Sequence, residues 1–131
     1  MGEEEEQEEI EMAYFFDSYA VIEIIKNNNN YLPYFDKDIN LSIFNLAEIY
    51  YNILNNFNEE KANEIYELYK EGVVEITDEI LKEAMKFRRE NKKKGFSYAD
   101  CIGYIYALEN NMKFLTGDRE FADMKNVEFV K

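Results

Sequence analysis

The sequence contains no histidine, no tryptophan, one proline and a single cysteine, Cys101. Without histidine, a Ser-His-Asp triad, a Cys-His pair and a histidine-based zinc site are all excluded. One cysteine rules out an internal disulfide and a thiolate zinc cluster, and an unpaired thiol is typical of a reducing cytoplasm. Any metal must therefore be held mainly by oxygen, which favours Mg²⁺ or Mn²⁺ over zinc.

Long apolar runs and basic residues are also scarce. No segment approaches the roughly 20 apolar residues needed to cross a membrane, and the N-terminus lacks the basic and apolar regions of a signal peptide. Lys and Arg number 15 against 28 Asp and Glu, a net charge of −13. An acidic balance is unfavourable for nucleic-acid binding, because phosphate contacts come from Lys and Arg. The missing apolar segment predicts a protein without a membrane span, and the missing signal peptide and the unpaired cysteine predict a cytoplasmic one.

Charge is unevenly distributed along the chain. Residues 1–11 hold seven of the acids in a low-complexity run, which we expect to be disordered and outside the fold. Basic residues cluster farther along, and this cluster consists of Arg88, Arg89, Lys92, Lys93 and Lys94. Such a patch is either a solvated helix end favoured by the helix dipole or an RNA-binding surface, and the sequence leaves both readings open.

The rest of the chain, residues 12–131, is long enough for one domain with its own core. Strand-like apolar runs lie at 12–16, 39–43, 73–76, 113–115 and 127–130, and helical segments separate them. The clearest helical period contains Leu46, Ile49 and Ile53, while Asn58, Thr77 and Ser97 suit helix N-caps. This alternation predicts an α/β fold with a mostly parallel sheet.

Four acids fall where strands end and helices begin, and sites form at such junctions in open parallel sheets. They are Asp17, Glu48, Asp100 and Asp118. Each also has a structural interpretation. Asp17 and Asp118 could cap helices, Asp100 has capping-box spacing from Ser97, and Glu48 has it from Asn45 while lying opposite the apolar stripe of its helix.

The four acids gain significance as a group. Asp100 opens the run 101–108, which is apolar on almost every side and is therefore predicted to be buried. Carboxylates gathered in one cleft repel one another and need a counter-cation. Mg²⁺ or Mn²⁺ meets that need with oxygen ligands and retained waters, and it can activate water for phosphodiester hydrolysis. No histidine base is required for this chemistry.

The order of these motifs resembles the PIN-domain ribonucleases, especially the VapC-like toxins of toxin–antitoxin pairs. The resemblance covers residues 12–131 and is carried by four segments. They are 15–22 (FFDSYAVI), 41–51 (LSIFNLAEIYY), 97–104 (SYADCIGY) and 115–121 (LTGDREF). Each segment alone is weakly specific, but four in the right order are fairly specific.

The resemblance implies a three-layer fold with a twisted, mostly parallel five-stranded sheet flanked by helices. It also implies Mg²⁺- or Mn²⁺-dependent RNA cleavage, with Asp17, Glu48, Asp100 and Asp118 as the catalytic, metal-binding set. Homodimers and an inhibitory antitoxin are further expectations. Thr116 is counted with the RNA-binding residues, where it would orient Asp118 or a metal-bound water, unless its hydroxyl only satisfies the turn backbone.

One departure from the family pattern is Tyr19, which stands where the family often has a small polar residue. Other protein classes fit this sequence less well than the PIN-domain ribonucleases. A signalling receiver domain needs paired acids after its first strand, and a haloacid-dehalogenase-like phosphatase needs an aspartate at position 19. The remaining alternative is a catalytically degenerate PIN domain that acts as a protein-interaction module through apolar, tyrosine-rich helices.

Overall fold

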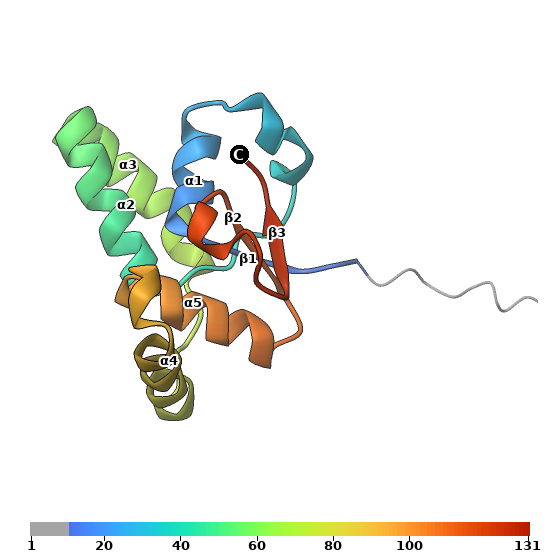
Figure 1. Cartoon of the computed structure of the whole chain (residues 1–131). Helices are drawn as coiled ribbons and strands as arrows, with labels where there is room; N and C mark the ends of the chain where they lie inside the picture. Colours follow the sequence, from blue (N-terminus) through green and yellow to red (C-terminus); the bar gives the residue numbers. More distant parts are fainter. Residues whose placement is uncertain (1–10) are drawn as a thin grey trace, which may run out of the picture.

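The computed structural model describes residues 11–131 and shows a small parallel sheet between two layers of helices (Figure 1). The predicted acidic segment 1–11 lies outside the described residues except for Glu11. Three regular strands form the sheet: β1 (Tyr14–Phe16), β2 (Lys113–Thr116) and β3 (Val127–Phe129). They lie in the order β1-β2-β3, all parallel, with Phe15 opposite Phe114 and Phe114 opposite Val127.

The two other predicted strands, 39–43 and 73–76, are reduced to isolated parallel bridges. Asn40 bridges to Phe15, and Leu41 bridges to Val73. The segment cannot extend further because Ser42 accepts from the backbone N–H of Asn45 and starts a helix at once. Five extended segments still lie side by side, as the predicted α/β fold requires, but only three of them are regular strands.

Five α-helices cover the two faces of the sheet. One face carries α1 (Ser18–Ile25), α2 (Ile43–Asn56) and α3 (Glu59–Tyr69), and the other carries α4 (Asp78–Glu90) and α5 (Tyr98–Glu109). Figure 1 shows α2 and α3 paired as an arm that projects from the body. Short 3₁₀ turns are η2 (Asn29–Tyr34), η3 (Lys70–Gly72), η4 (Lys92–Lys94) and η5 (Arg119–Phe121). The predicted N-caps Asn58, Thr77 and Ser97 are confirmed.

Alternate residues of the strands feed two cores, as the two-residue period of a strand requires. Phe16 and Leu115 point into the core beneath α1, α2 and α3. Phe15 and Phe114 point to the opposite face, where they meet α5 and α4. Strands β1 and β2 are largely buried, which explains why their sequences read as apolar runs. Strand β3, at the edge of the sheet, is partly exposed.

Gly103 lets α5 approach the sheet closely. A Cβ atom built there would lie 2.4 Å from the ring of Phe15, so a larger residue would force the helix away. The predicted burial of α5 is confirmed, since Cys101, Ile102 and Tyr104 are almost wholly inaccessible. The close approach holds the N-terminal turn of α5, which carries Asp100, beside the ends of the strands.

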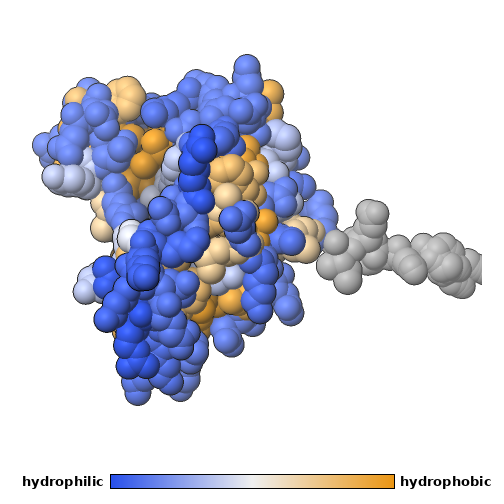
Figure 2. All heavy atoms as spheres, viewed as in Figure 1, coloured by the Kyte–Doolittle hydropathy of each residue, from blue (hydrophilic) through white to orange (hydrophobic). Residues whose placement is uncertain are grey.

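The surface is mostly hydrophilic, particularly over α4, with apolar side chains exposed in places (Figure 2). The α2–α3 arm carries several of them, including Tyr51, Phe57 and Leu68. Among residues 11–131, no helix is both long and apolar enough to cross a membrane.

Candidate active site

Asp17 occupies the carboxyl end of β1, where it is only 2% exposed. Its Oδ1 accepts from the backbone N–H of Ser18 at 2.9 Å, and its Oδ2 accepts from the Thr116 hydroxyl at 2.6 Å. The predicted capping role at the start of α1 is confirmed. Both carboxylate oxygens are therefore fixed in place, one by the start of α1 and the other by the end of β2.

Thr116 is fully buried at the end of β2. Its hydroxyl donates to Asp17 and accepts from the backbone N–H of Asp118 at 3.1 Å. The expectation that its hydroxyl satisfies the turn backbone agrees with the second of these bonds, whereas a contact of Thr116 with RNA or with a metal-bound water stays a prediction. Its place in the site is to orient the carboxylate of Asp17 and to close the turn that precedes Asp118.

Glu48 is exposed on α2, yet its side chain turns toward β1. The Ser18 hydroxyl donates to Glu48 Oε1 at 2.6 Å and accepts from the Asn45 side-chain amide at 3.0 Å. The predicted Asn45–Glu48 capping box is wrong, because Asn45 instead pairs with Ser42. Glu48 is thereby free to take part in this network, which links α1 to α2.

Ser18 and Asn45 are site residues that the sequence analysis missed. Both are buried polar residues, and such groups require hydrogen-bonding partners. The signal available in the sequence is a serine directly after the first acid. A second is an asparagine one helical turn before Glu48, on the same face of α2.

Asp100 and Asp118 complete the acidic edge, a name used below for Asp17, Glu48, Asp100 and Asp118. Asp100 is half-buried in the first turn of α5, where it accepts from the backbone N–H of Ser97 in the predicted capping box. Asp118 caps η5 by accepting from the backbone N–H of Glu120 at 3.0 Å. Capping and membership of the acidic edge are compatible, since a carboxylate has more than one acceptor position.

The acids perturb one another electrostatically. Burial raises the pKa of Asp17 to about 8, and the charges of Asp100 and Glu48 contribute to the rise against the hydrogen bonds from Thr116 and Ser18. Burial likewise raises the pKa of Asp100 to about 6, with contributions from Glu48 and Asp118. These mutual effects place all four carboxylates in one electrostatic neighbourhood at the end of the sheet.

This neighbourhood has negative charge without compensation from the protein. In the described part of the chain, the ion pairs join Lys26 to Glu23 and Lys70 to Glu67, and none involves the acidic edge. A group of raised-pKa carboxylates without a cationic partner is a frequent mark of a functional site. The donor set, all carboxylate oxygen, fits a hard divalent cation such as Mg²⁺ or Mn²⁺.

The acids do not converge tightly. Within residues 11–131, no three Asp, Glu or Cys side chains form a group that could hold an ion as they stand. Cys101 adds no ligand, because burial raises the pKa of its thiol to about 12 and leaves it protonated. An ion would have to draw the exposed side chains of the acidic edge toward the fixed carboxylate of Asp17.

The predicted basic patch lies beside the start of α5. The guanidinium of Arg88 sits 4.3 Å from the ring centroid of Tyr98, and its Nε donates to the backbone carbonyl of Phe96. Lys94 Nζ donates to the backbone carbonyl of Glu120, close to Asp118. Arg88, Arg89 and Lys92 help line a surface hollow of about 350 Å³, while Lys93 is exposed.

The comparisons with known proteins agree with this fold. The fold and site define an α/β domain with acids gathered at the carboxyl edge of a parallel sheet. The family model of the PIN domain matches residues 14–127. The chain therefore belongs to the PIN domain family, and the resemblance predicted from the sequence is confirmed.

Solved structures with the same fold come from several bacteria. A toxin–antitoxin complex from Klebsiella pneumoniae has a TM-score of 0.69 at 16% identity, covering 88% of this chain and 96% of that one. VapBC2 from Rickettsia felis, bound to a promoter DNA fragment, has a TM-score of 0.69 at 18% identity, covering 92% and 100%.

VapBC-1 from nontypeable Haemophilus influenzae has a TM-score of 0.64 at 22% identity, covering 90% of this chain and 96% of that one. No curated protein sequence matches this chain. At these identities the likeness establishes the fold alone, which is the fold of the PIN domain.

Proposed function

We propose that this PIN domain is a metal-dependent endoribonuclease that hydrolyses RNA phosphodiester bonds and acts as the toxin of a VapBC-type pair. The observation that carries the proposal is the acidic edge. Asp17 is buried, and its pKa is raised to about 8 by burial and by neighbouring carboxylates. Among the described residues, no Lys or Arg side chain forms an ion pair with it. A site of this kind favours a divalent cation, which PIN domain nucleases generally use.

The residues of the acidic edge divide the work. Asp17, Glu48, Asp100 and Asp118 are the candidate ligands of Mg²⁺ or Mn²⁺, and Thr116 and Ser18 hold the first two in orientation. When bound, the ion supplies charge neutralisation at the phosphate and activation of a water molecule. In the hydrolysis, the water oxygen bonds to phosphorus, one P–O ester bond breaks, and the leaving oxygen takes up a proton.

RNA binding is assigned to the basic patch. Arg88, Arg89, Lys92, Lys93 and Lys94 lie on α4 and η4, beside the helix that carries Asp100. Cations at this position can hold backbone phosphates while the acids act on the scissile one. The patch would give RNA a positively charged contact surface although the chain as a whole has a negative net charge.

The exposed apolar residues of the α2–α3 arm are the part of the surface to which we assign protein binding. Tyr51 is 68% exposed and Leu68 is 65% exposed, and large apolar groups in such positions mark interaction surfaces. We assign them to a homodimer contact or to an antitoxin, because structures with the same fold include a toxin–antitoxin complex. A reducing cytoplasm is the proposed location, where the thiol of Cys101 stays unpaired.

The alternative is a catalytically degenerate PIN domain kept for its interactions. One observation favours it: no three acids in residues 11–131 are grouped closely enough to hold an ion as they stand. This alternative needs the same fold and the same apolar arm. It differs in predicting that the acids can be neutralised without loss of function.

The direct test is cleavage of a mixed RNA panel by purified protein in Mn²⁺, Mg²⁺ and EDTA. An Asp17→Asn/Asp100→Asn double variant serves as the inactive reference, and Asp123→Asn, which changes an exposed acid outside the acidic edge, serves as the matched control. We expect metal-dependent cuts by the wild type and by Asp123→Asn, and none by the double variant. Absence of cutting by all three proteins would favour the degenerate domain.

A further inference from the structure

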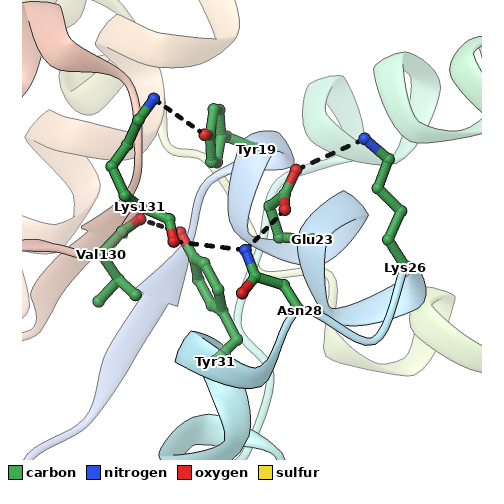
Figure 3. A network of polar contacts seen from close by, with 7 residues as sticks. All are labelled: Tyr19, Glu23, Lys26, Asn28, Tyr31, Val130 and Lys131. Carbon is green, nitrogen blue, oxygen red and sulfur yellow. Dashed lines mark hydrogen bonds and ion pairs between the residues drawn. The ribbon is translucent and has the colours of Figure 1, made fainter.

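We infer that Lys131, which lies against Tyr19 near Asp17, is an RNA-contacting cation in addition to the basic patch and binds a backbone phosphate of the substrate. This inference rests on the proposed ribonuclease function and deepens it. It starts from the network of Figure 3, in which Tyr19, Asn28, Tyr31, Val130 and Lys131 meet.

The backbone of Lys131 is held at the carboxyl edge of the sheet. The Val130 N–H donates to the carbonyl of Thr116 at 2.9 Å, which continues the pairing of β3 with β2. The Tyr31 hydroxyl donates to the carbonyl of Val130 at 2.6 Å. The side-chain amides of Asn28 and Asn30 donate to the main-chain oxygen of Lys131 at 3.3 and 3.0 Å. The segment therefore ends beside the loop that carries Asp118.

The side chain of Lys131 is placed by Tyr19. Its Nζ donates to the Tyr19 hydroxyl at 3.2 Å and lies 5.4 Å from the ring centroid, which is within the range of a cation–π contact. No carboxylate among the described residues forms an ion pair with this ammonium group. The positive charge is thus positioned by neutral and aromatic groups, and its remaining N–H donors stay available to an anion.

Tyr19 in turn is fixed between two segments of the acidic edge. It follows Asp17 and Ser18 on α1, and it packs on Gly117, which separates Thr116 from Asp118. A Cβ at Gly117 would lie 2.3 Å from the Tyr19 ring and 2.5 Å from the Val130 carbonyl oxygen. Glycine is therefore needed at this position for the close approach. Tyr19, which differs from the small polar residue that the family often has at this position, thereby contacts the ammonium group of Lys131.

A similar pair of a cation and an aromatic ring occurs near Asp100. Arg88 sits over Tyr98, two residues before Asp100, and Lys131 sits over Tyr19, two residues after Asp17. An RNA strand bound at four carboxylates needs cations near them, since the acids repel its phosphates. Arg88 would supply one such contact near Asp100, and Lys131 would supply one near Asp17.

The test compares Lys131→Ala and Lys131→Arg with Lys26→Ala. Lys26 is the matched control, because it is a nearby exposed lysine whose ammonium group pairs with Glu23 at 3.6 Å instead of with Tyr19 (Figure 3). Metal-dependent cleavage of a fluorescein-labelled single-stranded RNA gives kcat and KM. Binding of the same RNA by each protein carrying Asp100→Asn, measured at several salt concentrations, gives the salt slope.

For Lys131→Ala we expect KM to rise about three- to tenfold, with kcat within about twofold of the wild type. The RNA association constant decreases as salt increases, and in a plot of log K against log salt this negative slope should become shallower by about 0.7. That is the value of about 0.7 for one phosphate contact on a single strand. Lys131→Arg should restore both quantities, Lys26→Ala should change neither, and the melting temperature should stay constant in all three variants.

An unchanged KM and salt slope in Lys131→Ala, beside a wild type that cuts RNA, would overturn this inference and leave the ribonuclease intact. A lowered melting temperature with a lowered kcat would also overturn it, because it would make Lys131 a purely structural residue. A wild type that neither binds nor cuts the RNA would remove the proposed function, and this inference with it.

Discussion

The buried floor and the exposed rim of the acidic edge are built in different ways. The floor consists of Asp17 and Thr116, which are inaccessible and joined by a 2.6 Å hydrogen bond between two neighbouring strands. The rim consists of Glu48, Asp100 and Asp118, of which Glu48 is exposed and the other two are half-buried. All four acids accept hydrogen bonds, but only the floor is also buried, so we expect Asp17 to be the most rigid of the four carboxylates.

The largest expected effect comes from the floor. Asp17→Asn should lower kcat at least about 10³-fold, equivalent to roughly 4 kcal/mol of transition-state stabilisation, because the one fixed ligand loses its charge. Steady-state cleavage of RNA in Mn²⁺ measures it. Circular dichroism should show a folded variant, since Asn keeps the size of the side chain. Activity within tenfold of the wild type would contradict the preorganised floor.

A smaller loss is expected on the rim. Glu48→Gln should lower kcat about 10- to 30-fold, or roughly 1.4 to 2 kcal/mol, because the other carboxylates remain. Gln keeps an oxygen that accepts from the Ser18 hydroxyl, so the melting temperature should not change. Equal losses for Glu48→Gln and Asp17→Asn would erase the distinction between rim and floor.

Thr116→Val tests the hydrogen bond that fixes the floor. We expect kcat to fall about tenfold and stability to fall by roughly 1–2 kcal/mol, the usual cost of leaving a buried partner without its donor. Thr116→Ser is the matched control, because it keeps the hydroxyl and should retain near-normal activity. If Val and Ser behaved alike in the cleavage assay, the Thr116 hydroxyl would have no part in orienting Asp17.

The local parts of this structure follow from the sequence. The stripe of Leu46, Ile49 and Ile53 indicates α2, and the Ser97–Asp100 spacing correctly predicts a capping box. Such features depend on residues three or four apart. The shortness of the extended segment at 39–43 was harder to predict. It depends on the hydrogen bond from the Asn45 N–H to the Ser42 hydroxyl, which starts α2 where a strand could have continued.

The non-local parts of the site could not be obtained this way. The hydrogen bond from Thr116 to Asp17 joins residues 99 positions apart, and no periodicity reports such a contact. Glu48 likewise appears as a plain surface residue on its helix until Ser18 is placed opposite it. The motif order predicted which acids share an edge, and folding alone determines which of them is buried.

The smallest expected effect is the pH dependence of stability in metal-free protein. The pKa of Asp17 is raised from 3.8 to about 8 in the folded state. A carboxyl with a raised folded-state pKa favours folding fully below its unfolded-state pKa, and this contribution is lost as pH rises through the folded-state value.

In EDTA, the melting temperature should therefore fall by roughly 5 °C or more between pH 5 and pH 8.5, since about 1 kcal/mol shifts it by roughly 4 °C. The fall should be smaller in Asp17→Asn, whose amide does not titrate, and Mn²⁺ should reverse it at pH 8.5 in the wild type. Thermal scans at several pH values measure these changes. The same fall in wild type and variant would assign the pH dependence to other groups.

The central claim is that the acidic edge binds a divalent cation through the fixed carboxylate of Asp17, and Mn²⁺ titration calorimetry tests it most directly. At pH 7, with a pKa of about 8, Asp17 is mostly protonated, so binding should release a proton and the measured heat should vary with buffer ionisation enthalpy. The account predicts saturable, proton-linked binding to the wild type and none to Asp17→Asn/Asp100→Asn. No binding to the wild type, or equal binding to both proteins, would contradict it.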